Sequence, residues 1–79
     1  MSLTAAQCRA ARALLKWSQD KLAEASKVGT STVGEFEREI RTPHDHILAD
    51  MRSALEAAGI EFTNGEQPGV RLRRKSNSP

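Results

Sequence analysis

The sequence lacks several features that whole classes of protein require. Cys8 is its one cysteine, so no internal disulfide can form, which suits a reducing compartment. No apolar run approaches a membrane span, and the N-terminus has no charged start followed by an apolar stretch. No nucleophile–base set, glycine-rich phosphate loop or paired carboxylate pattern is present. We therefore expect a cytoplasmic protein that is not an enzyme, does not span a membrane and needs no cofactor or small-molecule ligand.

A metal site is also not expected. His44 and His46 flank Asp45, but residues two apart on a helix do not face one another. No other histidine is present, and no second cysteine. We expect both histidines to be solvated at the start of a helix.

Charge is distributed unevenly along the 79 residues. The formal net charge is +2, but the last nine residues hold four of the twelve basic residues and none of the ten acidic ones. Nucleic-acid binding would thus depend on this basic end or on a local stripe of cations, because the rest of the chain is mildly acidic. A chain this short holds one domain, which we place at residues 1–73, with 74–79 as a basic disordered tail.

The stretch 19–37, QDKLAEASKVGTSTVGEFE, predicts two short helices joined by a tight turn. We expect its apolar residues to meet in one small core that fixes the angle between the helices. These residues are Leu22, Val28, Val33 and Phe36. The outer face of the second helix then carries small and polar residues: Thr30, Ser31, Gly34 and Glu35. A short helix held by its inner face and polar outside can lie in the DNA major groove.

Two further helices flank this stretch. The first runs over residues 5–17 from a capping box of Thr4 and Gln7. Its apolar residues recur at helical spacing, at Ala6, Ala10, Ala13, Leu14 and Trp17. The other begins at Pro43, with Thr42 as N-cap, and ends at Gly59. It carries an apolar stripe widened by Leu48, which could be core, dimer interface or both.

Alternating residues at 60–63 and 70–73 predict a β-hairpin after the last helix. Its apolar face carries Ile60, Phe62, Val70 and Leu72. A lone hairpin is marginal in water, so it must pack on the helices or pair with a second chain. Arg71 and Arg73 then lie on its polar face, where they either blunt an edge strand or reach DNA.

The pattern Gln19-x-x-Leu22-Ala23, followed by Val28, Val33 and Phe36-Glu37, resembles the lambda-repressor/Cro-like helix-turn-helix family, also called XRE-like. The segments RALLKWSQDKLAEAS and AAGIEF…GVRLRR are similar to a bacterial subgroup of compact XRE-like regulators. The resemblance covers residues 3–74. It implies a mainly α fold: a four-helix lambda-repressor-like helix-turn-helix domain, here with a C-terminal β-hairpin.

The resemblance also implies roles for individual residues. Base edges would be read by Thr30, Ser31, Gly34 and Glu35. Arg12 and Glu37 fall where many members have a buried ion pair, in which the arginine can also face a phosphate. Gln19 would contact a phosphate, as would the cations Lys21, Lys27, Arg38 and Arg41. From the tail we add Arg74 and Lys75 as phosphate contacts.

The chain departs from the family pattern at three kinds of position. Lys27 and Glu39 stand where glycine is usual, and a left-handed lysine at position 27 would cost on the order of 1 kcal/mol. Gly29 stands where Ser or Thr usually caps the recognition helix. The outer face of that helix carries none of the Arg or Gln residues that close relatives use, which argues against strong readout of guanine by arginine from this helix.

These observations predict a sequence-specific transcriptional regulator, acting as a repressor or autoregulator. It would bind a palindromic double-stranded DNA operator as a homodimer, as do regulators of phages, plasmids and other mobile elements. The candidate dimer interfaces are the hairpin residues Ile60, Phe62, Val70 and Leu72, and the helix residue Leu48. The alternative is a protein-binding helix-turn-helix module, antitoxin-like or antiactivator, with weak or no DNA binding. The acidic body favours that alternative, as do Glu35 and Glu39.

Overall fold

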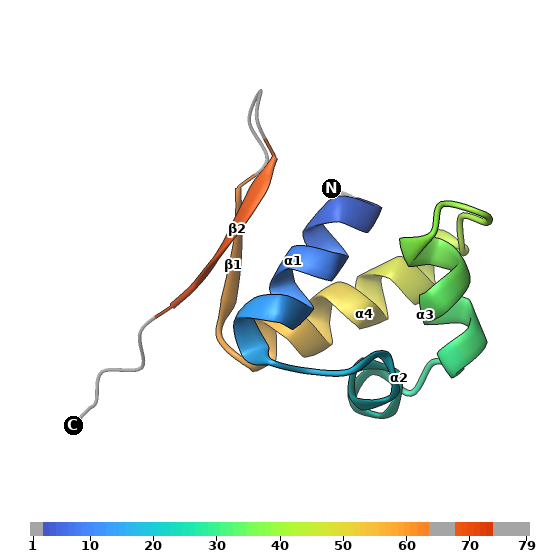
Figure 1. The fold of residues 1–79 in the computed structure, drawn as a ribbon, viewed down its shortest axis with the longest axis horizontal. Coiled ribbons are helices and arrows are strands. Elements are labelled where there is room, and N and C mark those ends of the chain that lie inside the picture. Colours follow the sequence, from blue (N-terminus) through green and yellow to red (C-terminus); the bar gives the residue numbers. More distant parts are fainter. Residues whose placement is uncertain (1–2, 64–67, 74–79) are drawn as a thin grey trace.

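The computed structural model describes residues 3–63 and 68–73. Along the chain lie α1 (Ala5–Leu15), α2 (Gln19–Ser26), α3 (Thr30–Glu37), α4 (Asp45–Ala57), β1 (Ile60–Thr63) and β2 (Gly69–Leu72) (Figure 1). This order confirms the predicted mainly α fold of four helices and a C-terminal hairpin. The tail at 74–79, with Arg74 and Lys75, lies outside the described residues, so its predicted role stays a prediction.

Helix α1 begins with the predicted capping box. The Gln7 backbone N–H donates to the Thr4 hydroxyl at 3.0 Å, and the Thr4 N–H donates to the Gln7 side-chain oxygen at 3.1 Å. The helix ends two residues earlier than predicted, because Lys16 turns into the left-handed region with φ 59°. That residue redirects the chain into the short connector before α2.

The apolar spacing noted in the sequence does not mark the buried face of α1. Ala6, Ala10, Ala13 and Leu14 are exposed, and the face that enters the core carries Gln7, Cys8 and Ala11. Alanine favours a helix wherever it points, so the alanine spacing did not report burial. A polar residue sits on the inner face because the Gln7 amide donates to the carbonyls of Thr63 and Gly69, both at 3.2 Å. It thereby ties α1 to both strands of the hairpin.

Helices α2 and α3 pack through the predicted small core. Leu22 and Val33 are fully buried, Phe36 is 6% exposed, and the half-buried Val28 of the turn packs against them. Ser18 caps α2 by accepting from the Lys21 N–H at 2.9 Å. Gly29 is the N-cap of α3 and makes no side-chain cap bond, as predicted. The small apolar core that sets the angle between the two helices is therefore present.

Helix α4 begins two residues later than predicted. Its N-cap is His44, not Thr42, and Pro43 precedes the helix. Because the His44 backbone is extended (ψ 156°) and not helical, its ring reaches His46 and the two rings stack with centroids 5.9 Å apart. The expectation that these histidines do not face one another was wrong for this reason. Gly59 follows the helix with φ 112°, in the position predicted for it.

The apolar stripe of α4 is core. Met51 and Leu55 are fully buried and Leu48 is 5% exposed, all within the cluster formed by the rest of this chain. Leu48 therefore has almost no surface left to offer a second copy. Within a single chain the stripe is therefore core, and not the dimer interface that the sequence left as the alternative.

The two strands pair antiparallel in a register that matches Ile60 with Leu72 and Phe62 with Val70. The predicted apolar face therefore exists, but its members are covered to different extents. Ile60 is 1% exposed, whereas Leu72 is 46% exposed. On the polar face, Arg71 Nε lies 2.6 Å from Glu61 Oε1, an exposed cross-strand pair.

The hairpin and α3 lie at opposite ends of the molecule in Figure 1, with α1 between them. Helix α1 contacts β2 and α3, and α4 contacts β1 and α2. Within the described ranges, no helix is long and apolar enough to cross a membrane. No element of the described part of the chain covers the outer side of α3.

Candidate nucleic-acid interface

Glu37 fixes the C-terminal end of α3. The residue is 3% exposed, and its carboxylate accepts four hydrogen bonds. Arg12 of α1 donates from Nε to Oε2 at 2.7 Å and from Nη2 to Oε1 at 2.6 Å. The Cys8 thiol donates to Oε2 at 3.1 Å, and the Gln19 amide donates to Oε1 at 3.1 Å. We call Cys8, Arg12, Gln19 and Glu37 the Glu37 cluster. It confirms the predicted Arg12–Glu37 pair and joins α1, α2 and α3.

Charge in the Glu37 cluster is balanced by these contacts. Burial by itself raises the pKa of Glu37, but the hydrogen bonds from Arg12, Cys8 and Gln19 outweigh it and hold the pKa below its usual value. The pKa of Arg12 is raised, chiefly by its hydrogen bonds to Glu37. The pKa of the Cys8 thiol is raised far above its usual value, first by burial and then by the bond to Glu37. Glu37 is therefore ionised and Cys8 is a neutral thiol near neutral pH.

Two further contacts of α1 were missed by sequence reasoning. Arg9 donates from Nη1 to the main-chain carbonyl of Glu37. A cation at the C-terminal end of a helix is favourable because the free carbonyls there carry partial negative charge. Arg12 also donates from Nη1 to the Trp17 carbonyl at 2.9 Å, which fixes the connector before α2. The spacing of Arg9 and Arg12 along the helix gives no indication of these contacts.

The outer face of α3 presents Thr30 and Ser31, both exposed. Glu35 lies on the same side, with 38% of its side chain exposed and its Oε1 3.6 Å from Arg41 Nε. Neither hydroxyl is covered by another described part of the chain. The carboxylate is partly neutralised by Arg41, so its repulsion toward a phosphate is reduced.

Gly34 falls on the predicted face of α3, one turn after Thr30, but it is not open to solvent. The residue is buried, and a Cβ added there would lie 3.3 Å from Gln19 Oε1 and 3.8 Å from Arg38 Nη2. The side chains of Gln19 and Arg38 therefore cover its backbone. Direct approach of Gly34 to a base would require both to move.

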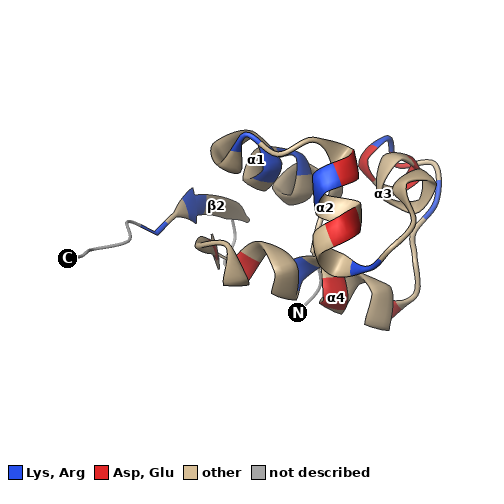
Figure 2. Ribbon diagram, turned by 90° about the horizontal axis from the view of Figure 1, so that it is seen from below, with Lys and Arg blue, Asp and Glu red and all other residues tan. Residues whose placement is uncertain are grey.

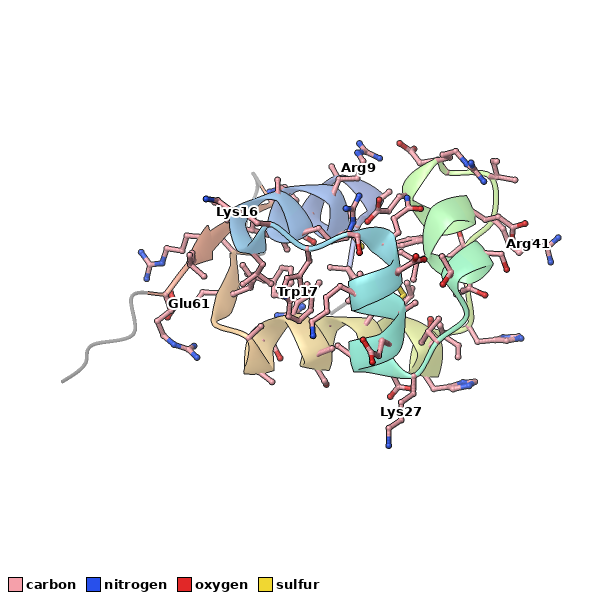
Figure 3. All side chains as sticks on the ribbon, turned by 60° about the horizontal axis from the view of Figure 1, so that its bottom comes forward. Arg9, Lys16, Trp17, Lys27, Arg41 and Glu61 are labelled. Carbon is pink, nitrogen blue, oxygen red and sulfur yellow. The ribbon has the colours of Figure 1, made fainter. Side chains whose placement is uncertain are left out.

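The residues expected to meet phosphate fall into two groups. Arg12 and Gln19 turn inward to Glu37, and three of the five N–H groups of Arg12 are already engaged. The other four are exposed cations: Lys21, Lys27, Arg38 and Arg41. Figure 3 shows Lys27 and Arg41 extending away from the body of the domain. Among the described residues, these four are exposed enough to approach a phosphate, with Arg41 also 3.6 Å from Glu35.

Two positions at which the family usually has glycine, 27 and 39, have a left-handed backbone in this chain. Lys27 ends α2 with φ 60° and ψ 41°, and Glu39 follows α3 with φ 62°. Both are left-handed conformations that glycine adopts without strain. The conformation proposed for Lys27 from the sequence is therefore confirmed.

The basic residues of the described ranges are spread over α1, α2, α4 and β2 and over segments outside the helices and strands. Figure 2 shows that α1 carries basic but no acidic residues, whereas α2, α3 and α4 each carry acidic residues. Among the residues that the structure describes, no three potential metal ligands come together. Binding to a polyanion would have to use the local cations around α3, not the average charge.

A comparison with known protein families identifies this arrangement of helices. A helix-turn-helix family model matches residues 9–59, which is well over half of the chain. The match includes α2, α3 and α4 in full and stops before the hairpin. No curated protein matches the sequence closely enough to count as a relative. With the Arg12–Glu37 pair and the α2–α3 geometry, this match shows that the chain belongs to the lambda-repressor/XRE-like helix-turn-helix family of DNA-binding regulators.

Proposed function

We propose that the protein is a sequence-specific transcriptional repressor or autoregulator that binds a palindromic operator as a homodimer. The observation that carries the proposal is the contrast between the two sides of α3. Four side-chain hydrogen bonds to Glu37 hold its inner side, while Thr30 and Ser31 face solvent. A helix held in this way can enter the major groove without the entropic cost of becoming ordered on binding.

Two copies are required because one α3 offers little discrimination. Hydroxyls and a paired carboxylate make weaker base contacts than bidentate Arg or Gln, and two linked half-sites add their contact energies. In a two-fold dimer of this family type, half-sites lie about one helical turn apart, roughly 34 Å.

The interface we propose is an apolar groove at the hairpin end of the domain. It is lined by Leu14 and Leu15 of α1, by residues at the end of α4 and by Leu72 of β2. Leu14 is 42% and Leu72 46% exposed. Of the other interface candidates, Ile60 and Leu48 are buried within the chain, and Phe62 and Val70 are half-buried. A second copy seated here would leave α3 free at the far end.

The interface is tested by sedimentation equilibrium on the double variant Leu14→Glu, Leu72→Glu. Charges in an apolar contact should convert dimer to monomer and weaken operator binding by at least tenfold. Ile40→Glu is the matched control, since Ile40 is 65% exposed but lies outside the groove. A double variant that stays dimeric would move the interface elsewhere.

The DNA-binding proposal is tested by titration on the region upstream of the gene at several salt concentrations. A regulator should bind one sequence preferentially, and the logarithm of its affinity should fall linearly with the logarithm of salt. Replacing Thr30 and Ser31 by Ala should lower the ratio of specific to non-specific affinity while the fold is kept. An unchanged ratio would assign the readout to other residues.

A protein-binding module with weak or no DNA binding is the second candidate. The acidic residues on or beside α3 favour it, namely Glu35 and Glu39. Weak binding to every DNA tested, with no preferred sequence, would support this candidate.

A further inference from the structure

Arg38 is the C-cap of α3, and its side chain lies back along the helix. Its Nη2 is 3.8 Å from the point where a Cβ would stand on Gly34, one turn earlier. Side chains on a helix lean toward its N-terminus, so an arginine four residues on covers that position. The guanidinium therefore lies over the middle of the recognition helix, and not beyond its end.

The gap that admits the guanidinium is a glycine inside a helix. Glycine is among the least favourable residues in a helix interior, so its presence in the eight-residue α3 calls for a local reason. Here the missing side chain leaves room for two others. Gln19 Oε1 lies 3.3 Å from the same point, so Gln19 and Arg38 converge over Gly34.

Arg38 is also available for a ligand. Across residues 3–63 and 68–73, its side chain forms no ion pair or hydrogen bond. The two nearest carboxylates on α3 are engaged elsewhere, since Glu35 pairs with Arg41 and Glu37 with Arg12. The unpaired guanidinium lies on the face of α3 that carries Thr30 and Ser31. It offers more and stronger hydrogen-bond donors than their hydroxyls.

We propose that Arg38, laid back over Gly34, reads a guanine in each half-site through its O6 and N7 atoms, and that Gln19 positions it. This rests on the proposed DNA-binding function and changes the role of Arg38 from a phosphate contact to a specificity-determining residue. It supplies the bidentate donor that the side chains at positions 30, 31 and 35 lack. Gly34 acts as the slot for that donor.

The test begins by selecting the preferred duplex from a random-sequence DNA pool with the full-length protein. Binding of wild type, Arg38→Ala and Arg38→Lys is then measured on every single-base-pair change of that duplex. Wild type should prefer G·C at one position per half-site by about 10- to 100-fold. Both variants should lose that preference and keep those at the other positions, because lysine retains the charge but not the two-donor fork.

Two matched variants sharpen the test. Lys21→Ala removes an exposed cation of α2 and should lower affinity for all sequences by a similar factor. Gly34→Leu fills the slot, and it should remove the same guanine preference while thermal unfolding still shows a folded domain. Replacing that guanine by 7-deazaguanine should weaken wild type but leave Arg38→Ala unaffected, because the N7 acceptor is absent.

The outcomes separate this inference from the function on which it rests. If Arg38→Ala weakens binding to every sequence equally and lowers the salt slope by about one, Arg38 contacts a phosphate and the inference is overturned. Full preference in Arg38→Lys would overturn it as well. If no duplex is enriched by wild type, the DNA-binding function itself fails.

Discussion

Arg12 and Glu37 form a two-pronged ion pair that joins the first helix of the domain to the end of its recognition helix. Both carboxylate oxygens are used, and the Glu37 side chain is 2% exposed against 19% for Arg12. Removing one member of such a pair leaves a buried charge without its partner, which is costlier than the pair is worth.

We therefore expect Arg12→Ala to lower the free energy of unfolding by about 3 kcal/mol. The double variant Arg12→Leu, Glu37→Leu should recover a large part of that loss, since no buried charge remains. Urea unfolding of Arg12→Leu, Glu37→Leu and the double variant gives the coupling energy. Additive losses would mean that the pair contributes little beyond its separate side chains.

Stability should fall in acid through Glu37. Its folded pKa lies below the ordinary value of 4.5, so it contributes stability above about pH 4.5. That contribution is lost as the pH falls through the folded pKa. Urea unfolding between pH 7 and pH 3 should show a decline that is smaller in Glu37→Gln. The same change at the exposed Glu24 is the control and should keep the wild-type profile.

The Cys8 thiol should be inert in the folded protein. It is fully buried and its pKa is raised by burial and by Glu37, so thiolate is scarce even at pH 8. Reaction with Ellman's reagent should be limited by unfolding and become fast in urea. A Cys8→Ala, Ala10→Cys variant, whose thiol is on the exposed side of α1, should react at once without urea. Rapid labelling of native wild type would contradict the burial of Cys8.

Glycine should stabilise the chain where the backbone is left-handed. Glu39→Gly relieves a strained φ of 62° and should raise the free energy of unfolding by about 0.5–1 kcal/mol. It also removes a negative charge next to α3, which should strengthen DNA binding at low salt. Lys21→Gly, inside α2, is the control and should destabilise by about 1 kcal/mol. Thermal unfolding ranks the two variants.

The sequence was informative where local chemistry decides the structure. The capping box at Thr4 and the stop at Gly59 follow from hydrogen bonding and backbone freedom within a few residues. The packing of Leu22 against Val33 follows from apolar spacing. These features predicted the fold class and the order of elements.

The sequence failed where a distant contact overrides a local pattern. Gln7 occupies the inner face of α1 because two hairpin carbonyls, some 60 residues away, accept from it. Cys8 and Gln19 reach Glu37 only after three helices have assembled. Gly34 was assigned to an open face because its covering side chains come from α2 and from the turn after α3.

The contacts that orient α3 do not involve the residues at positions 30, 31 and 35, because none of these three belongs to the Glu37 cluster. Under the proposed function, DNA preference can thus change by substitution at those three positions while the scaffold keeps its folding energy. DNA-binding regulators of new preference would then arise from this chain by a few surface changes, each tolerated singly. A library randomised at these positions should stay mostly folded yet diversify in the DNA it selects.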